Sequence, residues 1–167
     1  MAFDTYLKIT GPDVDGETTA ADHEKWIEIY SFSWGASNPV TVGSGSTGLA
    51  AGKVSVSSFN VMKKTEASSA PLFAACCAGQ HYKEATVDMR KATGVDGAQQ
   101  TFLKYVFSDV MVESIQWSGS TGGDDTPTES VSFAFGKVSI EYSKQDTEAG
   151  GMTPAGNASW DLTKVTK

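Results

Sequence analysis

Apolar and polar residues alternate with a period of two along most of this chain, which is typical of half-buried β-strands. Glycine, proline and acidic residues separate these stretches and predict turns. The six alternating segments cover residues 3–9, 26–34, 53–64, 81–90, 100–117 and 129–142. The pattern therefore predicts a mainly β protein.

The stretch from residue 65 to Gly79 breaks this alternation. Serine and threonine residues precede Pro71, a small apolar body follows, and Gly79 stops it. Cap residues, an early proline and a closing glycine are typical of a helix. We expect one helix over about residues 68–78, capping one end of the β structure.

Two of the predicted strands carry signs of irregularity. Segment 100–117 would extend on the order of 60 Å if straight, which is too long for a small barrel, so we expect strong twist, a bulge or a break near Ser108 and Asp109. In segment 129–142 the apolar positions change parity around Gly136. A bulge near Gly136 explains this change.

Many strands and a single helix predict a closed or nearly closed antiparallel β-barrel, since closure removes exposed sheet edges. At 167 residues the chain forms one domain, residues 1–167, with a polar tail from about residue 145 and a last short strand at 159–162. Several strands are apolar on both faces. The second face predicts association with another copy.

In segment 26–34, four aromatic residues share one face, which we assign to the barrel interior. They are Trp26, Tyr30, Phe32 and Trp34. Ser31 and Ser33 then lie on the opposite face and are candidates to face the lumen of an assembly.

A long glycine-rich connection at residues 38–52 is predicted to be a protruding arm, because long loops within compact domains are usually functional or mobile. Its candidate contact residues form one continuous run. They are Val40, Thr41, Val42, Gly43, Ser44, Gly45, Ser46, Thr47, Gly48 and Leu49.

Charge and hydropathy exclude several classes of partner. A net charge of −7 disfavours binding to nucleic acid, whose affinity comes largely from lysine and arginine. No apolar stretch is long enough to insert into a membrane, and residues 2–6 show no basic and then apolar export signal. We expect the protein to begin in the cytoplasm, and adjacent Cys76 and Cys77 fit a reducing compartment.

Three short motifs suggest chemistry and fail on context. Gly43 to Gly48 matches a dinucleotide-binding glycine pattern, but a strand and not a helix follows it. Asp13 and Asp15 evoke a calcium loop without its remaining ligands. Asp124 and Asp125 fit a turn. We expect no metal and no cofactor.

His23 and His81 are the two imidazoles, and they are far apart in sequence without a recognisable nucleophile motif. Cys76 and Cys77 lie in a small apolar helix and are expected to pack and not to react. We therefore expect no enzyme. A hydrolase using His81 or Asp88, and a monomeric ligand-binding barrel, remain the alternatives.

Ten blocks follow one another along nearly the whole chain, at residues 6–9, 16–18, 31–35, 43–56, 71–76, 79–82, 89–92, 105–114, 129–131 and 160–162. In content and order these blocks resemble the haemolysin-coregulated protein (Hcp) family of type VI secretion systems. The second cysteine at Cys77, the turn at residues 93–99 and the tail depart from the pattern.

This resemblance implies a homohexameric ring that stacks into the inner tube of the secretion system, similar to a phage tail tube. It implies a contractile sheath and a spike as partner proteins, and effector proteins carried in the lumen. Secretion through the apparatus without a signal peptide follows from the same resemblance. Nothing is catalysed in this interpretation.

Overall fold

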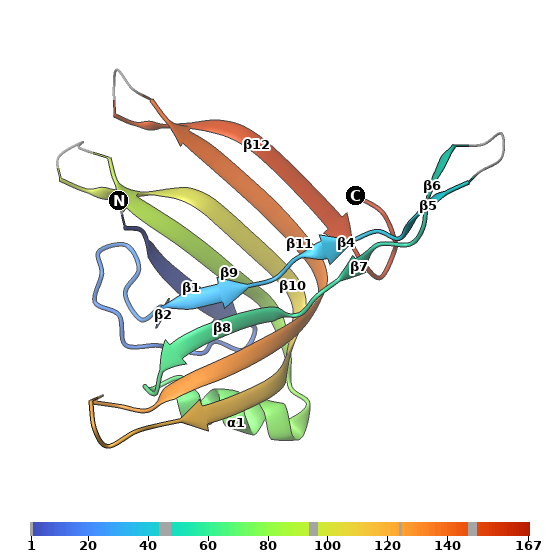
Figure 1. Cartoon of the computed structure of the whole chain (residues 1–167). Helices are drawn as coiled ribbons and strands as arrows, with labels where there is room; N and C mark the ends of the chain where they lie inside the picture. The colour runs from blue at the N-terminus through green and yellow to red at the C-terminus, as the bar shows by residue number, and fades with distance from the viewer. Residues whose placement is uncertain (1, 44–47, 94–96, 124, 147–149) are drawn as a thin grey trace.

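A computed structural model of the chain describes residues 2–43, 48–93, 97–123, 125–146 and 150–167 (Figure 1). It contains one helix and twelve strands within those ranges. In chain order these are β1 (Asp4–Thr10), β2 (Ile27–Ile29), β3 (Ser31–Ser33), β4 (Ala36–Ser37), β5 (Val40–Val42), β6 (Leu49–Ala51), β7 (Ser55–Val56), β8 (Phe59–Lys64), α1 (Ser69–Ala78), β9 (His81–Ala92), β10 (Gln99–Ser118), β11 (Thr128–Gln145) and β12 (Met152–Asp161).

The main sheet has the order β2-β1-β9-β10-β11-β8-β3, and β12 pairs with β11 beside this path. All its pairings are antiparallel. The first and last strands of the order, β2 and β3, are joined through Tyr30 alone, whose amide donates to the carbonyl oxygen of Met62 at 2.8 Å. The two sheet edges therefore meet, and the predicted nearly closed antiparallel barrel is confirmed.

The bend at Tyr30 corrects the prediction of one straight strand over residues 26–34. On β2 the buried side chains are Ile27 and Ile29, while Tyr30 is 56% exposed. After the bend, Phe32 of β3 packs against the core. The parity of buried positions changes because β2 pairs with β1 whereas β3 pairs with β8. The predicted interior assignment is right for Phe32 and Trp34 and wrong for Tyr30 and Trp26, whose ring packs against His23 and Lys8 instead.

Aromatic side chains fill the barrel interior. The ring of Phe107 lies 4.6 Å from the rings of both Phe59 and Phe135, and Trp34 packs edge-on against Phe107 at 5.5 Å. Such pairs add to the large free-energy gain from burying aromatic surface. Together with aliphatic side chains, these rings form one packed core.

The two longest strands curve around the barrel as predicted. β10 runs unbroken for 20 residues, but Asp109 has a positive φ of 54° opposite Gly136 of β11. A Cβ at Gly136 would lie 3.3 Å from the Asp109 Cβ, so glycine permits this close approach. In both strands the buried positions change from odd to even residue numbers around this pair. The shift in register between β10 and β11 falls a few residues later, between Val112 and Ser114.

The helix α1 ends one residue before Gly79, which adopts the left-handed conformation with φ 66°. Its amide donates to the carbonyl oxygen of Ala75, as expected for a glycine at a helix end. Leu72 of α1 is fully buried and joins the core. The helix lies beneath the barrel body in Figure 1, and the prediction of a helix over residues 68–78 is confirmed.

The last strand is longer than predicted. β12 begins at Met152, whereas we expected a short strand at residues 159–162, and it pairs with β11 along its length. Most of its side chains are exposed on both faces. This strand is held by backbone hydrogen bonds to β11. Its apolar and polar residues do not alternate, because neither face of the strand enters the core.

A buried ion pair ties α1 to the barrel. The Lys63 Nζ lies 3.1 Å from Glu129 Oε1, and both side chains are fully buried. The ammonium also donates to the Ser69 hydroxyl at 3.1 Å and to the Lys64 carbonyl oxygen at 3.2 Å. Desolvation of both charges offsets much of their attraction, so the pair mainly specifies position.

Removing one partner of this pair should be costly. We expect Lys63→Met to lower the free energy of unfolding by about 3–5 kcal/mol, because it leaves the Glu129 carboxylate buried without its cation. The double variant Lys63→Met/Glu129→Leu should recover most of that loss. Urea unfolding at matched protein concentration measures both. A single variant within about 1 kcal/mol of the parent would contradict the assignment.

Two buried tyrosines should make the fold sensitive to alkaline pH. Burial raises the pKa of Tyr82, and burial together with the nearby charges of Asp4 and Glu28 raises the pKa of Tyr6. Both phenols favour the neutral form in the folded state. Their contribution to stability is complete below about pH 10, the ordinary tyrosine value, and is lost as the pH rises through the raised values.

We expect an ultraviolet titration of the folded protein to show a late-ionising tyrosine fraction, because ionising Tyr82 requires charging a buried phenol. Tyr82→Phe should shrink that fraction, whereas the matched variant Tyr142→Phe, at an exposed position, should keep it. An unchanged late fraction in Tyr82→Phe would show that this phenol is accessible.

Candidate functional site

A polar cluster pins the long loop between β1 and β2 onto the barrel. The Nε2 of His23 lies 2.7 Å from Asp88 Oδ2, and the guanidinium of Arg90 lies 3.1 Å from His23 Nδ1. Because arginine only donates, His23 Nδ1 accepts and Nε2–H donates to Asp88. The His23 ring also packs 4.3 Å from Trp26 and 5.3 Å from Tyr6. These contacts describe a structural histidine.

The structure places His81 and Asp88, either of which the hydrolase alternative would use, far apart from each other. His81 and Asp88 belong to the same strand, β9, seven positions apart, which separates them by roughly 23 Å. His81 is exposed, whereas Asp88 is buried beside His23. The two side chains cannot act on one reacting atom.

The short motifs that suggested chemistry in the sequence lie in strands and turns. Gly43 and Gly48 close a hairpin, since the Gly43 amide donates to the Gly48 carbonyl oxygen at 3.1 Å, and residues 44–47 lie outside the described part of the chain. Strand β6 and not a helix follows, so no helix N-terminus faces this turn. Among the described residues no group of three or more metal-ligating side chains is gathered.

The cysteines are both free. Cys76 packs partly against the core, and its sulfur lies 3.9 Å from the Glu113 carbonyl oxygen. Cys77 is exposed on α1. They form no disulfide with each other. The expected packing is right for Cys76 and wrong for Cys77, which faces away from the core.

The feature most distinct from the barrel is an arm formed by β4 and β7 and then by β5 and β6. The arm extends well beyond the body of the molecule (Figure 1). The described part of the chain leaves its outer apolar side chains exposed: Val42 is 78% exposed, Leu49 72% and Val40 54%. The predicted protruding arm is therefore a hairpin of short strands and not an irregular loop.

Short hydrogen bonds stabilise the middle of the arm. The Gly52 amide donates to Asn38 Oδ1 at 2.8 Å and to the Pro39 carbonyl oxygen at 2.9 Å. An added Cβ at Gly52 would lie 2.7 Å from the Pro39 side chain, so glycine lets the two strands come together. An isolated ribbon of two short strands is only marginally stable in water, so packing against another surface would stabilise the arm.

The predicted site residues divide into two places. Of the ten arm residues, Ser44, Gly45, Ser46 and Thr47 lie outside the described part of the chain, and the other six are exposed on the arm. Ser31 and Ser33 lie on β3 beside Asn60 and Met62 of β8, and both are exposed. The structure does not bring these two sets together.

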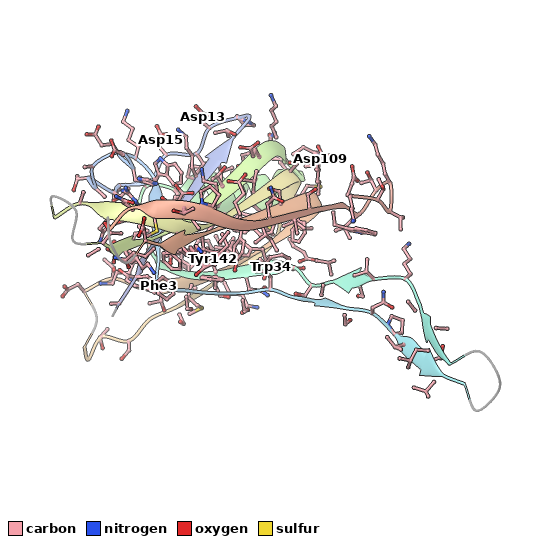
Figure 2. All side chains as sticks on the ribbon, turned by 90° about the horizontal axis from the view of Figure 1, so that it is seen from above. Phe3, Asp13, Asp15, Trp34, Asp109 and Tyr142 are labelled. Carbon is pink, nitrogen blue, oxygen red and sulfur yellow. The ribbon has the colours of Figure 1, made fainter. Side chains whose placement is uncertain are left out.

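Two further groups of exposed aromatic side chains were not predicted from the sequence. The rings of Phe73 of α1 and Trp117 of β10 pack at a tilt with centroids 5.7 Å apart, while both side chains remain exposed. Phe3 lies at the end of the molecule away from the arm (Figure 2), and both Phe3 and Tyr30, which lines the same hollow, are more than half exposed. No periodic pattern marks them, because exposure here depends on which strands meet.

The chain end near the arm is ordered by a capped turn. Asp161 accepts hydrogen bonds from the Thr163 hydroxyl at 2.6 Å and from the Thr163 and Lys164 amides at 2.9 and 3.1 Å. These bonds lower the pKa of the Asp161 carboxyl.

Within the described ranges, no helix is both long and apolar enough to span a bilayer.

Comparison with known proteins gives a consistent result. Residues 6–142 match the family described as type VI secretion system effector, Hcp. The chain is 35% identical over 148 residues to the protein hcp1 of Pseudomonas aeruginosa, covering 89% of this chain and 88% of that protein.

Solved structures agree with this match. A structure described as a type six secretion system protein is 38% identical, with a TM-score of 0.89 and 99% of both chains covered. The structure of Hcp1 from Salmonella typhimurium is 32% identical, with a TM-score of 0.77 and 99% of both chains covered.

Proposed function

This chain belongs to the Hcp family of type VI secretion proteins, and we propose that six copies form a ring and that rings stack into the secretion tube. It is a structural, secreted component of such a system. The observation that supports the assembly most directly is the apolar arm, which its own chain leaves uncovered.

The barrel supplies rigidity and its outer surfaces supply contacts in this proposal. The core is filled by aromatic side chains, so shape does not depend on a bound ligand. A closed ring needs a heterologous contact in which one face of each subunit meets a different face of the next. The strands exposed on both faces, above all β12, are suitable for such contacts.

The arm is assigned to stacking between rings. Val40, Val42 and Leu49 present apolar surface beyond the body of the subunit, where a copy in the next ring can bury it. Burial of apolar area is the main favourable term in such association. Residues 40–49 therefore form the stacking segment.

Ser31 and Ser33 are assigned to the lumen. Small hydroxyl side chains on an exposed strand leave room and offer hydrogen bonds without a strong charge. Effector proteins carried in the tube are the proposed cargo, and the spike and sheath of the apparatus are the proposed neighbours. No catalysis is assigned, as the structural role of the family indicates.

The assembly itself is tested by native mass measurement and electron microscopy of the purified protein. We expect a species of six times the 17.6 kDa subunit mass and, at high concentration, tubes. A monomer at all concentrations would reject the proposal. Mass and images together separate rings from stacked rings.

Removing the arm tip should separate ring formation from stacking. Deletion of residues 43–48 should leave rings intact and weaken tubes, because it shortens the stacking segment without touching the barrel core. Sedimentation and electron microscopy measure both states. A matched deletion in the turn at residues 119–123, which lies away from the arm, should leave tubes unchanged. Tubes of normal abundance after the arm deletion would contradict the role.

A bulky residue at Ser33 should act on cargo and not on assembly. Ser33→Trp adds volume at an exposed position, so we expect normal rings with reduced retention of a bound effector, measured by co-purification. Ser33→Thr is the matched control because it keeps the hydroxyl and adds little volume. Loss of rings in Ser33→Trp would place Ser33 at a subunit contact instead.

A further inference from the structure

The outward face of three neighbouring strands carries small polar side chains in rows. Residues directly opposite each other in antiparallel strands lie side by side on one face. Met62 of β8 lies opposite Ser31 of β3 on one side and opposite Ser130 of β11 on the other. The next row, two residues along β8, consists of Ser33, Asn60 and Ser132. We call these two rows the hydroxyl face.

The hydroxyl face contains no charged residue, and its one apolar residue is Met62. The neighbours of Met62 along the strand, Val61 and Lys63, point into the barrel and are buried, so the methionine points outward and is 39% exposed. Methionine is flexible and polarisable and is frequent on surfaces that bind varied partners. Met62 therefore gives an otherwise polar face one adaptable apolar contact.

Met62 also has the most exposed thioether among the residues that the structure describes. Met89 lies in the core and is 1% exposed, and Met111 and Met152 are partly buried. The serine side chains beside Met62 are short, so they leave its sulfur open to a small molecule. The susceptibility of a sulfur atom to oxidation follows its exposure.

From this placement we infer that Met62 is a modification site, at which a peroxide converts the one thioether of the hydroxyl face to a sulfoxide. The Met62 sulfur attacks one oxygen of hydrogen peroxide, the O–O bond breaks and an S–O bond forms. The second oxygen leaves as water with both peroxide protons. The sulfur is oxidised by two electrons and the peroxide is reduced, and methionine sulfoxide reductases reverse the modification.

The residues around Met62 accommodate the product. A sulfoxide oxygen accepts hydrogen bonds, and the hydroxyls of Ser31 and Ser130 are available as donors on either side of it. The core is not disturbed, because the side chain points away from it. Oxidation therefore makes the hydroxyl face polar throughout and leaves the fold intact.

The effect on carried proteins rests on the function proposed above. Ser31 and Ser33 of the hydroxyl face are the residues assigned to the lumen, so Met62 faces the same side. In a closed ring the same side chain recurs in every subunit, and weak contacts that recur add together. Oxidation then removes every copy of this apolar contact from the lumen without breaking the ring.

Peroxide oxidation followed by peptide mass spectrometry tests the modification. The full chain carries Cys76→Ser and Cys77→Ser, because free thiols react with the same oxidant. In assembled protein we expect Met62 to form sulfoxide about tenfold faster than Met89, and faster than partly buried Met111 and Met152, because oxidation follows exposure. Conversion of Met62 no faster than that of Met89 would overturn the inference.

Retention on a phenyl resin measures the loss of apolar surface. Peroxide should shorten the retention of the parent, whereas Met62→Gln, which is polar and unbranched like the sulfoxide, should elute early without peroxide. Met62→Leu should elute with the parent and should not respond at this position. The matched variant Met152→Leu should keep the response. An equal peroxide response in the parent and in both Met62 variants contradicts the inference.

Electron microscopy of the same samples separates the inference from the assembly. Absence of rings in the untreated parent rejects the proposed function, and the oxidation rates of the unassembled chain then still decide the inference. Rings that persist while Met62 is oxidised rapidly support it. Rings that dissociate on oxidation of Met62, and not in Met62→Leu, overturn it, because Met62 then lies at a subunit contact.

Discussion

The bend at Tyr30 is the constraint on which the architecture depends. A single residue separates β2 from β3, yet these strands belong to opposite ends of the sheet order. The Tyr30 amide bonds to Met62 of β8, so the chain itself joins the two edges. Without this bend the sheet would stay open and present two unpaired edges, which favour uncontrolled association.

Closure determines what the inside of the barrel contains and what the outside is free to do. Aliphatic side chains and aromatic rings from several strands pack together in the interior. The apolar surface that remains uncovered lies on the arm, at the opposite end and beside α1. This distribution of exposed apolar surface is consistent with the structural role of the family.

Buried polar groups fix the positions of α1 and of the loop before β2 on the barrel. Lys63 and Glu129 hold the start of α1 against the barrel, and the pair formed by His23 and Asp88 holds the loop that precedes β2. Each group is buried with its partner, so either alone would carry the cost of an unpaired buried polar group. These contacts give α1 and the loop before β2 a defined position on the barrel.

The sequence by itself determined the strands, the helix and the arm, because side-chain alternation, cap residues and glycines are local signals. It also indicated the family, since ordered blocks cover nearly the whole chain. Only the tertiary structure decided the bend at Tyr30, the buried state of Lys63 and the full length of β12. The physical reason is that burial, parity and backbone pairing at these positions depend on which distant strand lies alongside, and no local pattern carries that information.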